Sequence, residues 1–111
     1  MTQVHRKYLT DVQEAIQHIT TFLTLTPTFE QYAGNLLVRR AVERELEIIG
    51  EAMSQLLKTE LPPNILNARR IIDLRNRVIH GYDTVDDSIL WGVLKRHLPE
   101  LKKEVDILLS L

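Results

Sequence analysis

A chain of 111 residues is large enough for one domain with a modest core, and we expect residues 1–111 to form a single domain that association would stabilise further. The sequence has no cysteine, which excludes disulfides and thiolate chemistry, and no apolar stretch long enough to span a bilayer, so a reducing cytoplasm away from membranes is the simplest setting. With a formal net charge of −1, the chain lacks the general basic field of a protein that coats nucleic acid, and any contact with nucleic acid has to be local.

The first predicted helix covers roughly residues 5 to 24. Apolar residues recur there at steps of three and four, which places them on one helical stripe. The stripe contains Leu9, Val12, Ile16, Ile19 and Leu23. Thr26-Pro27 then breaks the pattern and ends the helix.

A second, longer helix is predicted to begin at Thr28, which forms a capping box with Gln31. No breaker follows before about Thr59, so the pattern predicts one unbroken helix over 28–59. Its apolar residues lie on more than one stripe, which indicates several packing partners, one of them a second subunit. Gly50 costs this helix about 1 kcal/mol relative to alanine, which makes sense where another backbone approaches closely.

The third predicted helix lies between two clear boundaries. Leu61-Pro62-Pro63 stops the preceding helix, and Asn64 can cap the next one. This third helix is expected to end near His80, because Gly81 suits the left-handed position that follows a helix C-terminus.

Thr84 is predicted to cap a fourth helix, which has Asp86 and Asp87 in its first turn. Pro99 interrupts that pattern, which continues as a last helix or as a kinked extension. No useful stretch alternates with the period of a β-strand. The sequence therefore predicts an all-α fold, an up-and-down bundle of four to five helices.

Candidate chemistry is concentrated between Arg75 and Tyr82, at the end of the third predicted helix. This segment brings together a guanidinium, the amide of Asn76, the imidazole of His80 and a phenol. On a helix that turns about 100° per residue, Asn76 and His80 share a face, whereas Arg75 and His80 lie about 140° apart. This separation favours a groove lined by two copies of the chain.

Simpler roles for the same residues remain open at this stage. His80 could cap the last carbonyls of its helix and do nothing else. Arg77 could support the site, or it could be a solvated side chain paired with Asp73 four residues earlier. Glu51 could be a buried partner for an arginine of the motif or an ordinary exposed helix residue.

Metal and nucleophile chemistry find little support in the sequence. The four histidines are dispersed, and no two have the spacing of ligands on one helical turn. No serine has a histidine or an acid spaced to activate it. We therefore expect no metal and no cofactor. Acid/base catalysis on a phosphodiester remains, and RNA supplies its own nucleophile in the 2′-hydroxyl.

The pattern of Arg75, four residues, His80, one residue and Tyr82 resembles the signature of the HEPN ribonucleases of the HepT branch, the toxins of prokaryotic toxin–antitoxin pairs. Other segments that resemble the family are residues 44–52, Val85-Asp86, Trp91 and Leu98-Pro99. The resemblance implies a HEPN-like helical fold, a homodimer or higher homo-oligomer with paired motifs at its interface, and metal-independent cleavage of RNA.

The same resemblance implies a role for each motif residue. Arg75 would bind the scissile phosphate, His80 would serve in acid/base catalysis, and Asn76 would orient the site. Tyr82 would be the position to which a minimal nucleotidyltransferase, the antitoxin partner, transfers AMP.

Two other classes of function fit the residues. The chain could be a non-catalytic, nucleotide-binding or regulatory subunit of a nucleotidyltransferase, in which Arg75 and His80 hold a phosphate without cutting RNA. It could also be a helical scaffold without chemistry. An RNA cleavage assay of the wild type and His80→Ala separates the first of these from a ribonuclease.

Overall fold

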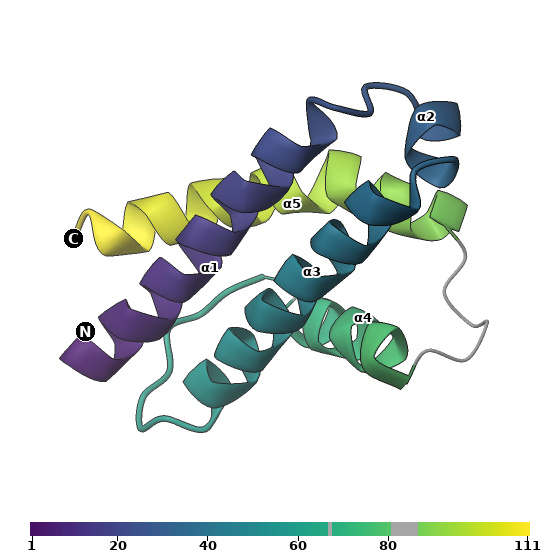
Figure 1. The fold of residues 1–111 in the computed structure, drawn as a ribbon. Coiled ribbons are helices and arrows are strands. Elements are labelled where there is room, and N and C mark those ends of the chain that lie inside the picture. The colour runs from purple at the N-terminus through teal and green to yellow at the C-terminus, as the bar shows by residue number, and fades with distance from the viewer. Residues whose placement is uncertain (67, 81–86) are drawn as a thin grey trace.

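The computed structural model describes residues 1–66, 68–80 and 87–111, apart from the side chains of residues 78–80. Within these ranges the chain forms five helices and no strand, which confirms the predicted all-α class. The helices are α1 (Gln3–Leu23), α2 (Phe29–Ala33), α3 (Leu36–Leu57), α4 (Ala68–His80) and α5 (Asp87–Leu109). The long helices α1, α3, α4 and α5 alternate in direction, as an up-and-down bundle requires (Figure 1).

The first helix matches its predicted stripe, since all five apolar residues named for it are buried. Its N-terminus is closed by a reciprocal cap: the backbone N–H of His5 donates to Thr2 Oγ1, and the N–H of Thr2 donates to His5 Nδ1. Because Nδ1 accepts, Nε2 carries the hydrogen of the neutral ring and donates to Thr59 Oγ1 at 2.8 Å. The buried His5 therefore fastens the start of α1 to the end of α3.

The prediction of one unbroken helix over 28–59 is wrong. The capping box of Thr28 and Gln31 is present, but it opens only the five-residue α2. Gly34 ends α2, and the Asn35 side chain accepts a hydrogen bond from Val38 N–H at 3.0 Å to start α3. One long helix with several packing partners can therefore no longer serve as an argument for a second subunit.

The packing of Tyr32 explains why the chain turns at α2 and does not continue as one straight helix. Tyr32 is fully buried, and its ring centroid lies 5.3 Å from that of Trp91 on α5. Burial, with smaller contributions from Glu43 and Asp87, raises the pKa of the Tyr32 phenol, which therefore stays neutral. A straight helix would have carried this aromatic side chain away from α5, so tertiary packing overrides the helical propensity of the segment.

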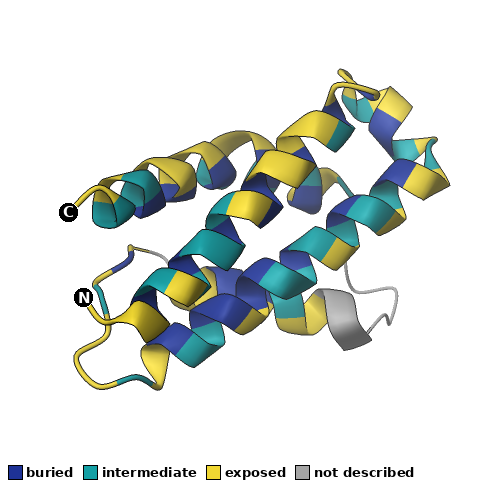
Figure 2. Cartoon of the chain, turned by 60° about the vertical axis from the view of Figure 1, so that its left-hand side comes forward, coloured by how far each residue is buried: buried dark blue, intermediate teal, exposed yellow. Residues whose placement is uncertain are grey.

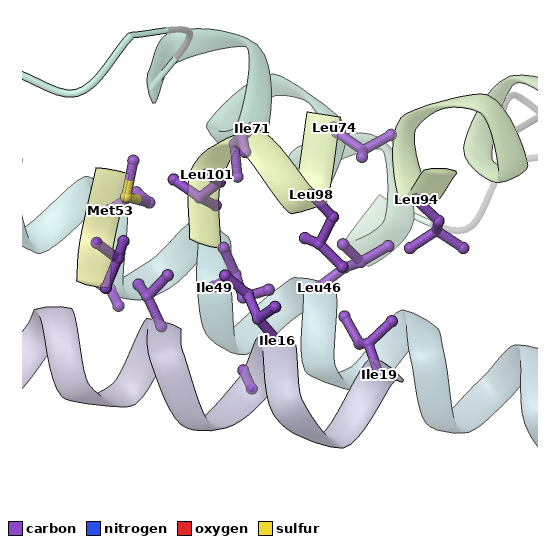
Figure 3. Packing of buried hydrophobic residues seen from close by; sticks show 14 of the residues in the cluster. Ile16, Ile19, Leu46, Ile49, Met53, Ile71, Leu74, Leu94, Leu98 and Leu101 are labelled. Atoms are coloured by element: carbon purple, nitrogen blue, oxygen red, sulfur yellow. The ribbon is translucent and has the colours of Figure 1, made fainter. Parts of the chain in front are cut away.

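The core lies where the four long helices meet. The buried residues alternate with exposed ones along α1 and α3 (Figure 2). Apolar side chains from all four helices converge in the close view of Figure 3. They include Ile16 and Ile19 of α1, Leu46, Ile49 and Met53 of α3, Ile71 and Leu74 of α4, and Leu94, Leu98 and Leu101 of α5.

The later boundaries are only partly as predicted. The third helix begins at Ala68, and not directly after Asn64, because Ile65 enters the core from the connecting segment and Leu66 N–H donates to Glu104 Oε2 at 2.8 Å. Pro99 lies inside α5, which continues as one helix to Leu109. The predicted cap Thr84 and Asp86 lie outside the described residues. No helix in the described part of the chain is long and apolar enough to cross a bilayer.

Candidate functional site

The motif arginine Arg75 is held by the contact between α4 and α3. Its side chain lies directly over Gly50, where an added Cβ would overlap Cβ and Cγ of Arg75 and lie 3.2 Å from its Nε. Only glycine leaves room for this approach. The sequence predicted close contact at Gly50, and the structure identifies a side chain, and not a backbone, as the approaching group.

Glu51, the next residue on α3, is the partner of that arginine. Arg75 Nη2 lies 3.4 Å from Glu51 Oε2, and the Glu51 side chain is held by Gln55 Nε2, which donates to Oε1 at 2.9 Å. The Arg75 side chain is 16% exposed, whereas that of Glu51 is 56% exposed. The pairing of Glu51 with an arginine of the motif is thus confirmed, but its burial is not.

This ion pair leaves the guanidinium available. A pair with one well-exposed partner contributes roughly 0–1 kcal/mol, because water screens it. Arg75 Nε is buried and has no hydrogen-bond partner among the described residues. A phosphate offers several strong acceptor oxygens to a planar fork of donors, so it could replace or share the contact with Glu51.

A groove of about 550 Å³ passes over this arginine, between α1 and α3. Its lining is formed by Lys7, Tyr8, Asp11, Arg44, Glu47, Ile48, Glu51, Ala52, Gln55 and Arg75. Most of the charges here are already paired: Lys7 Nζ contacts Asp11 Oδ2 at 2.8 Å, and Arg44 Nη1 lies 3.5 Å from Glu47 Oε2. Gln55, which orients Glu51, was not predicted from the sequence, although its i,i+4 spacing from Glu51 on the helix is the relevant signal.

Two further predicted residues, Asn76 and Arg77, follow Arg75 on α4. Asn76 and Arg77 are exposed on α4, and Arg77 forms no ion pair with Asp73 in the described structure. The α-helix continues without a break from Arg75 to His80, so these two positions remain about 140° apart around the helix axis. The His80 side chain and all of Tyr82 lie outside what the structure describes, as does Gly81.

Metal-ligating side chains do not cluster in the described part of the chain, where no three His, Cys, Asp or Glu residues are placed to hold an ion. The expectation of metal-free chemistry stays a prediction.

An up-and-down helical bundle, with a largely buried arginine fixed against a glycine of the neighbouring helix, defines an all-α protein with a candidate phosphate-binding group. The family profile described as "Ribonuclease HepT-like" matches residues 12–108. The chain belongs to this family of HepT-like ribonucleases.

Curated relatives agree with that membership. The chain is 36% identical over 108 residues to "Probable ribonuclease HepT" of Thermococcus cleftensis, with 92% of this chain and 93% of the relative covered. It is 34% identical over 104 residues to "Putative RNase MJ1380" of Methanocaldococcus jannaschii, with 92% and 94% covered. No solved structure matches the chain.

Proposed function

We propose that this protein is a metal-independent endoribonuclease in which Arg75, Asn76 and His80 act on a phosphodiester of RNA. The observation that carries the proposal is the placement of Arg75, which is largely buried over Gly50 yet retains only a weak, exposed partner. Membership of a ribonuclease family supports RNA as the substrate.

The proposed reaction needs little more than these groups. The 2′-hydroxyl of the RNA attacks the adjacent phosphorus, the bond to the 5′-oxygen breaks, and a 2′,3′-cyclic phosphate remains. A neutral His80 takes the proton of the 2′-hydroxyl, and a protonated imidazole returns a proton to the leaving 5′-oxygen. Arg75 stabilises the negative charge on the non-bridging oxygens, and Asn76 orients the backbone.

A homodimer would complete this site. One imidazole cannot accept a proton on one side of the phosphorus and donate one on the other side at the same moment, whereas two subunits supply two. Leu36 and Leu37 at the start of α3 are 54% and 81% exposed, which leaves apolar surface for an interface.

Light scattering at assay concentration should report a dimer. A demonstrably monomeric form with full activity would contradict a site shared by two subunits.

The metal-free mechanism makes a direct prediction about chelators and products. Cleavage of a single-stranded RNA should continue at the same rate in EDTA and leave 2′,3′-cyclic phosphate and 5′-hydroxyl ends, because the nucleophile needs no metal-bound water. Mass spectrometry of the fragments identifies the ends. Complete loss in EDTA with stoichiometric recovery by a divalent ion would overturn the mechanism.

We further propose that the protein is the toxin of a toxin–antitoxin pair that acts in the cytoplasm, and that Tyr82 is its point of control. A nucleotidyltransferase antitoxin would transfer AMP from ATP to the phenol oxygen of Tyr82 and release pyrophosphate. The added nucleotide and its negative phosphate, two residues from His80, would compete with the RNA backbone for Arg75.

Incubation with the cognate nucleotidyltransferase, ATP and magnesium should therefore add AMP mass to the peptide that contains Tyr82, while ribonuclease activity falls in proportion. Tyr82→Phe should still cleave RNA but escape inhibition, because it has no phenol oxygen to modify. Peptide mapping by mass spectrometry and a parallel cleavage assay provide the two measurements. Undiminished cleavage by fully modified protein would contradict a regulatory role for Tyr82.

A further inference from the structure

A second cavity, of about 700 Å³, lies between α4 and α5 and is distinct from the groove over Arg75. Its lining comes from Arg69, Arg70, Asp73, Leu74 and Arg77 of α4 and from Ile89, Gly92, Val93, Arg96 and His97 of α5. Four arginines and one aspartate therefore surround one hollow, in a chain whose net charge is −1.

These four arginines differ from the rest of the chain's arginines in their partners. Arg39, Arg40, Arg44 and Arg75 each pair with a carboxylate, and Arg6 donates to the carbonyls of Leu109 and Leu111. None of the four cavity arginines forms an ion pair with another described residue. All four are exposed, and together they give this cavity a positive local field that attracts an anion.

His97 adds a polar group without a partner. Arg70 Nη1 lies 3.2 Å from His97 Nε2, and an arginine can only donate, so Nε2 accepts and Nδ1 carries the ring hydrogen. His97 Nδ1 is buried and has no acceptor among the described residues. Because this nitrogen is buried, it does not face the cavity, and the donors there that can reach an anion are the guanidinium groups.

The shape of the cavity favours a chain of phosphates over a single small anion. The cations are distributed along both helices, and the apolar Ile89 beside them is 58% exposed. The wall at Gly92 is open, since an added Cβ would meet no atom within 4 Å. Single-stranded RNA combines a phosphate backbone with bases that stack on apolar surfaces and guanidinium planes.

The cavity lies on the face of α4 that carries position 80, opposite the side on which Arg75 contacts Gly50. The helix α4 ends at His80, three residues after Arg77, which is the spacing of neighbouring positions on one helix face. From Arg69 to His80 the helix rises about 16 Å, enough for more than one phosphate.

We propose that this α4–α5 cavity binds the backbone of single-stranded RNA next to the bond that is cut. Arg69, Arg77 and Arg96 neutralise phosphates, and Arg70 donates a hydrogen bond to His97 Nε2 in the same wall. The inference rests on the proposed ribonuclease function, which it extends from the reacting phosphate to the flanking substrate.

The test compares two matched double variants in a His80→Ala background, which prevents cleavage during binding measurements. Arg69→Gln/Arg96→Gln removes one exposed cation from each wall, and Arg40→Gln/Lys58→Gln removes two exposed cations that line neither hollow as the control. Fluorescence anisotropy with a labelled single-stranded RNA should show a Kd about tenfold higher for the cavity variant only. The salt dependence of log K should become shallower by about 1.4, since each lost phosphate contact on a single strand contributes roughly 0.7.

Cleavage by the active enzyme separates this inference from the proposed function. With His80 present, Arg69→Gln/Arg96→Gln should lower kcat/KM for a long RNA about tenfold and leave cleavage of a dinucleotide unchanged. Weakened RNA binding by a protein that never cleaves RNA would support the cavity and refute the ribonuclease.

Other outcomes would overturn the cavity proposal. Equal loss of RNA affinity in both double variants would show that RNA responds to the overall charge of the protein and not to this cavity. Unchanged RNA affinity together with weakened binding of ATP, or of the nucleotidyltransferase partner, would assign the cavity to a nucleotide or to an acidic protein surface instead.

Discussion

His80→Ala is expected to lower the rate of RNA cleavage by about 10²–10⁴-fold, because no other group of the motif exchanges protons near neutral pH. His80 is the last residue of α4, so circular dichroism should show unchanged helicity and a nearly unchanged Tm. The measurement is single-turnover cleavage of an end-labelled RNA. Cleavage by the variant at the wild-type rate would show that His80 is not catalytic. If the wild type binds RNA tightly but does not cleave it, the function as a regulatory subunit is favoured.

Arg75 should be tested alongside His80, with a different control. Arg75→Ala is expected to lose at least about 10²-fold in cleavage, but it also removes packing against Gly50 and should lower Tm. Arg75→Lys keeps the aliphatic stem and the charge but removes the planar fork of donors. Compared with Arg75→Ala, it should therefore restore the Tm more fully than the rate of RNA cleavage. Arg40→Ala removes an exposed arginine that is paired within its own helix, so it should change neither the Tm nor the rate of RNA cleavage.

Gly50→Ala is expected to damage both stability and activity. The new Cβ would overlap Cβ and Cγ of Arg75, atoms so close to the backbone that α3 and α4 have to separate. Overpacking of this kind costs about 1–3 kcal/mol, enough to lower Tm by several degrees. Displacement of Arg75 should reduce RNA cleavage by up to about 10²-fold at temperatures where the variant is still folded.

Gly92→Ala is the matched control for this substitution. Gly92 also lies inside a helix, but a Cβ there would meet nothing within 4 Å. The substitution should therefore raise stability by about 0.5–1 kcal/mol through the higher helical propensity of alanine. Thermal unfolding followed by circular dichroism measures both variants. A Gly50→Ala protein as stable as the wild type would contradict the close contact between Gly50 and Arg75.

The features that depend on neighbours in sequence are those that the sequence predicted well. The stripe of α1 and the capping box at Thr28 both follow from contacts within a few residues. The family signature is of the same kind, because Arg75, His80 and Tyr82 are recognised by spacing alone. Fold class and family could therefore be predicted from the sequence.

The break between α2 and α3 could not be predicted from the sequence. Gly34-Asn35 is a weak local signal inside a long stretch of good helix formers, and what decides the corner is the burial of Tyr32 against Trp91, far away in the chain. Local propensity favours continuation of the helix, and a long-range aromatic contact outweighs it.

The arginines illustrate the same division. Sequence order places Arg69, Arg70, Arg75 and Arg77 in one basic segment, and helical geometry alone separates Arg75 from the others. Only the packing of α4 between α3 and α5 decides that Arg75 meets Gly50 and Glu51 while the other three face Arg96 and His97. The sequence by itself determined which charged groups this protein has and on which helix faces they lie. The tertiary structure decided that Arg39 and Arg75 meet carboxylates of other helices while the cavity arginines meet none, because such pairs depend on residues brought together from distant parts of the chain.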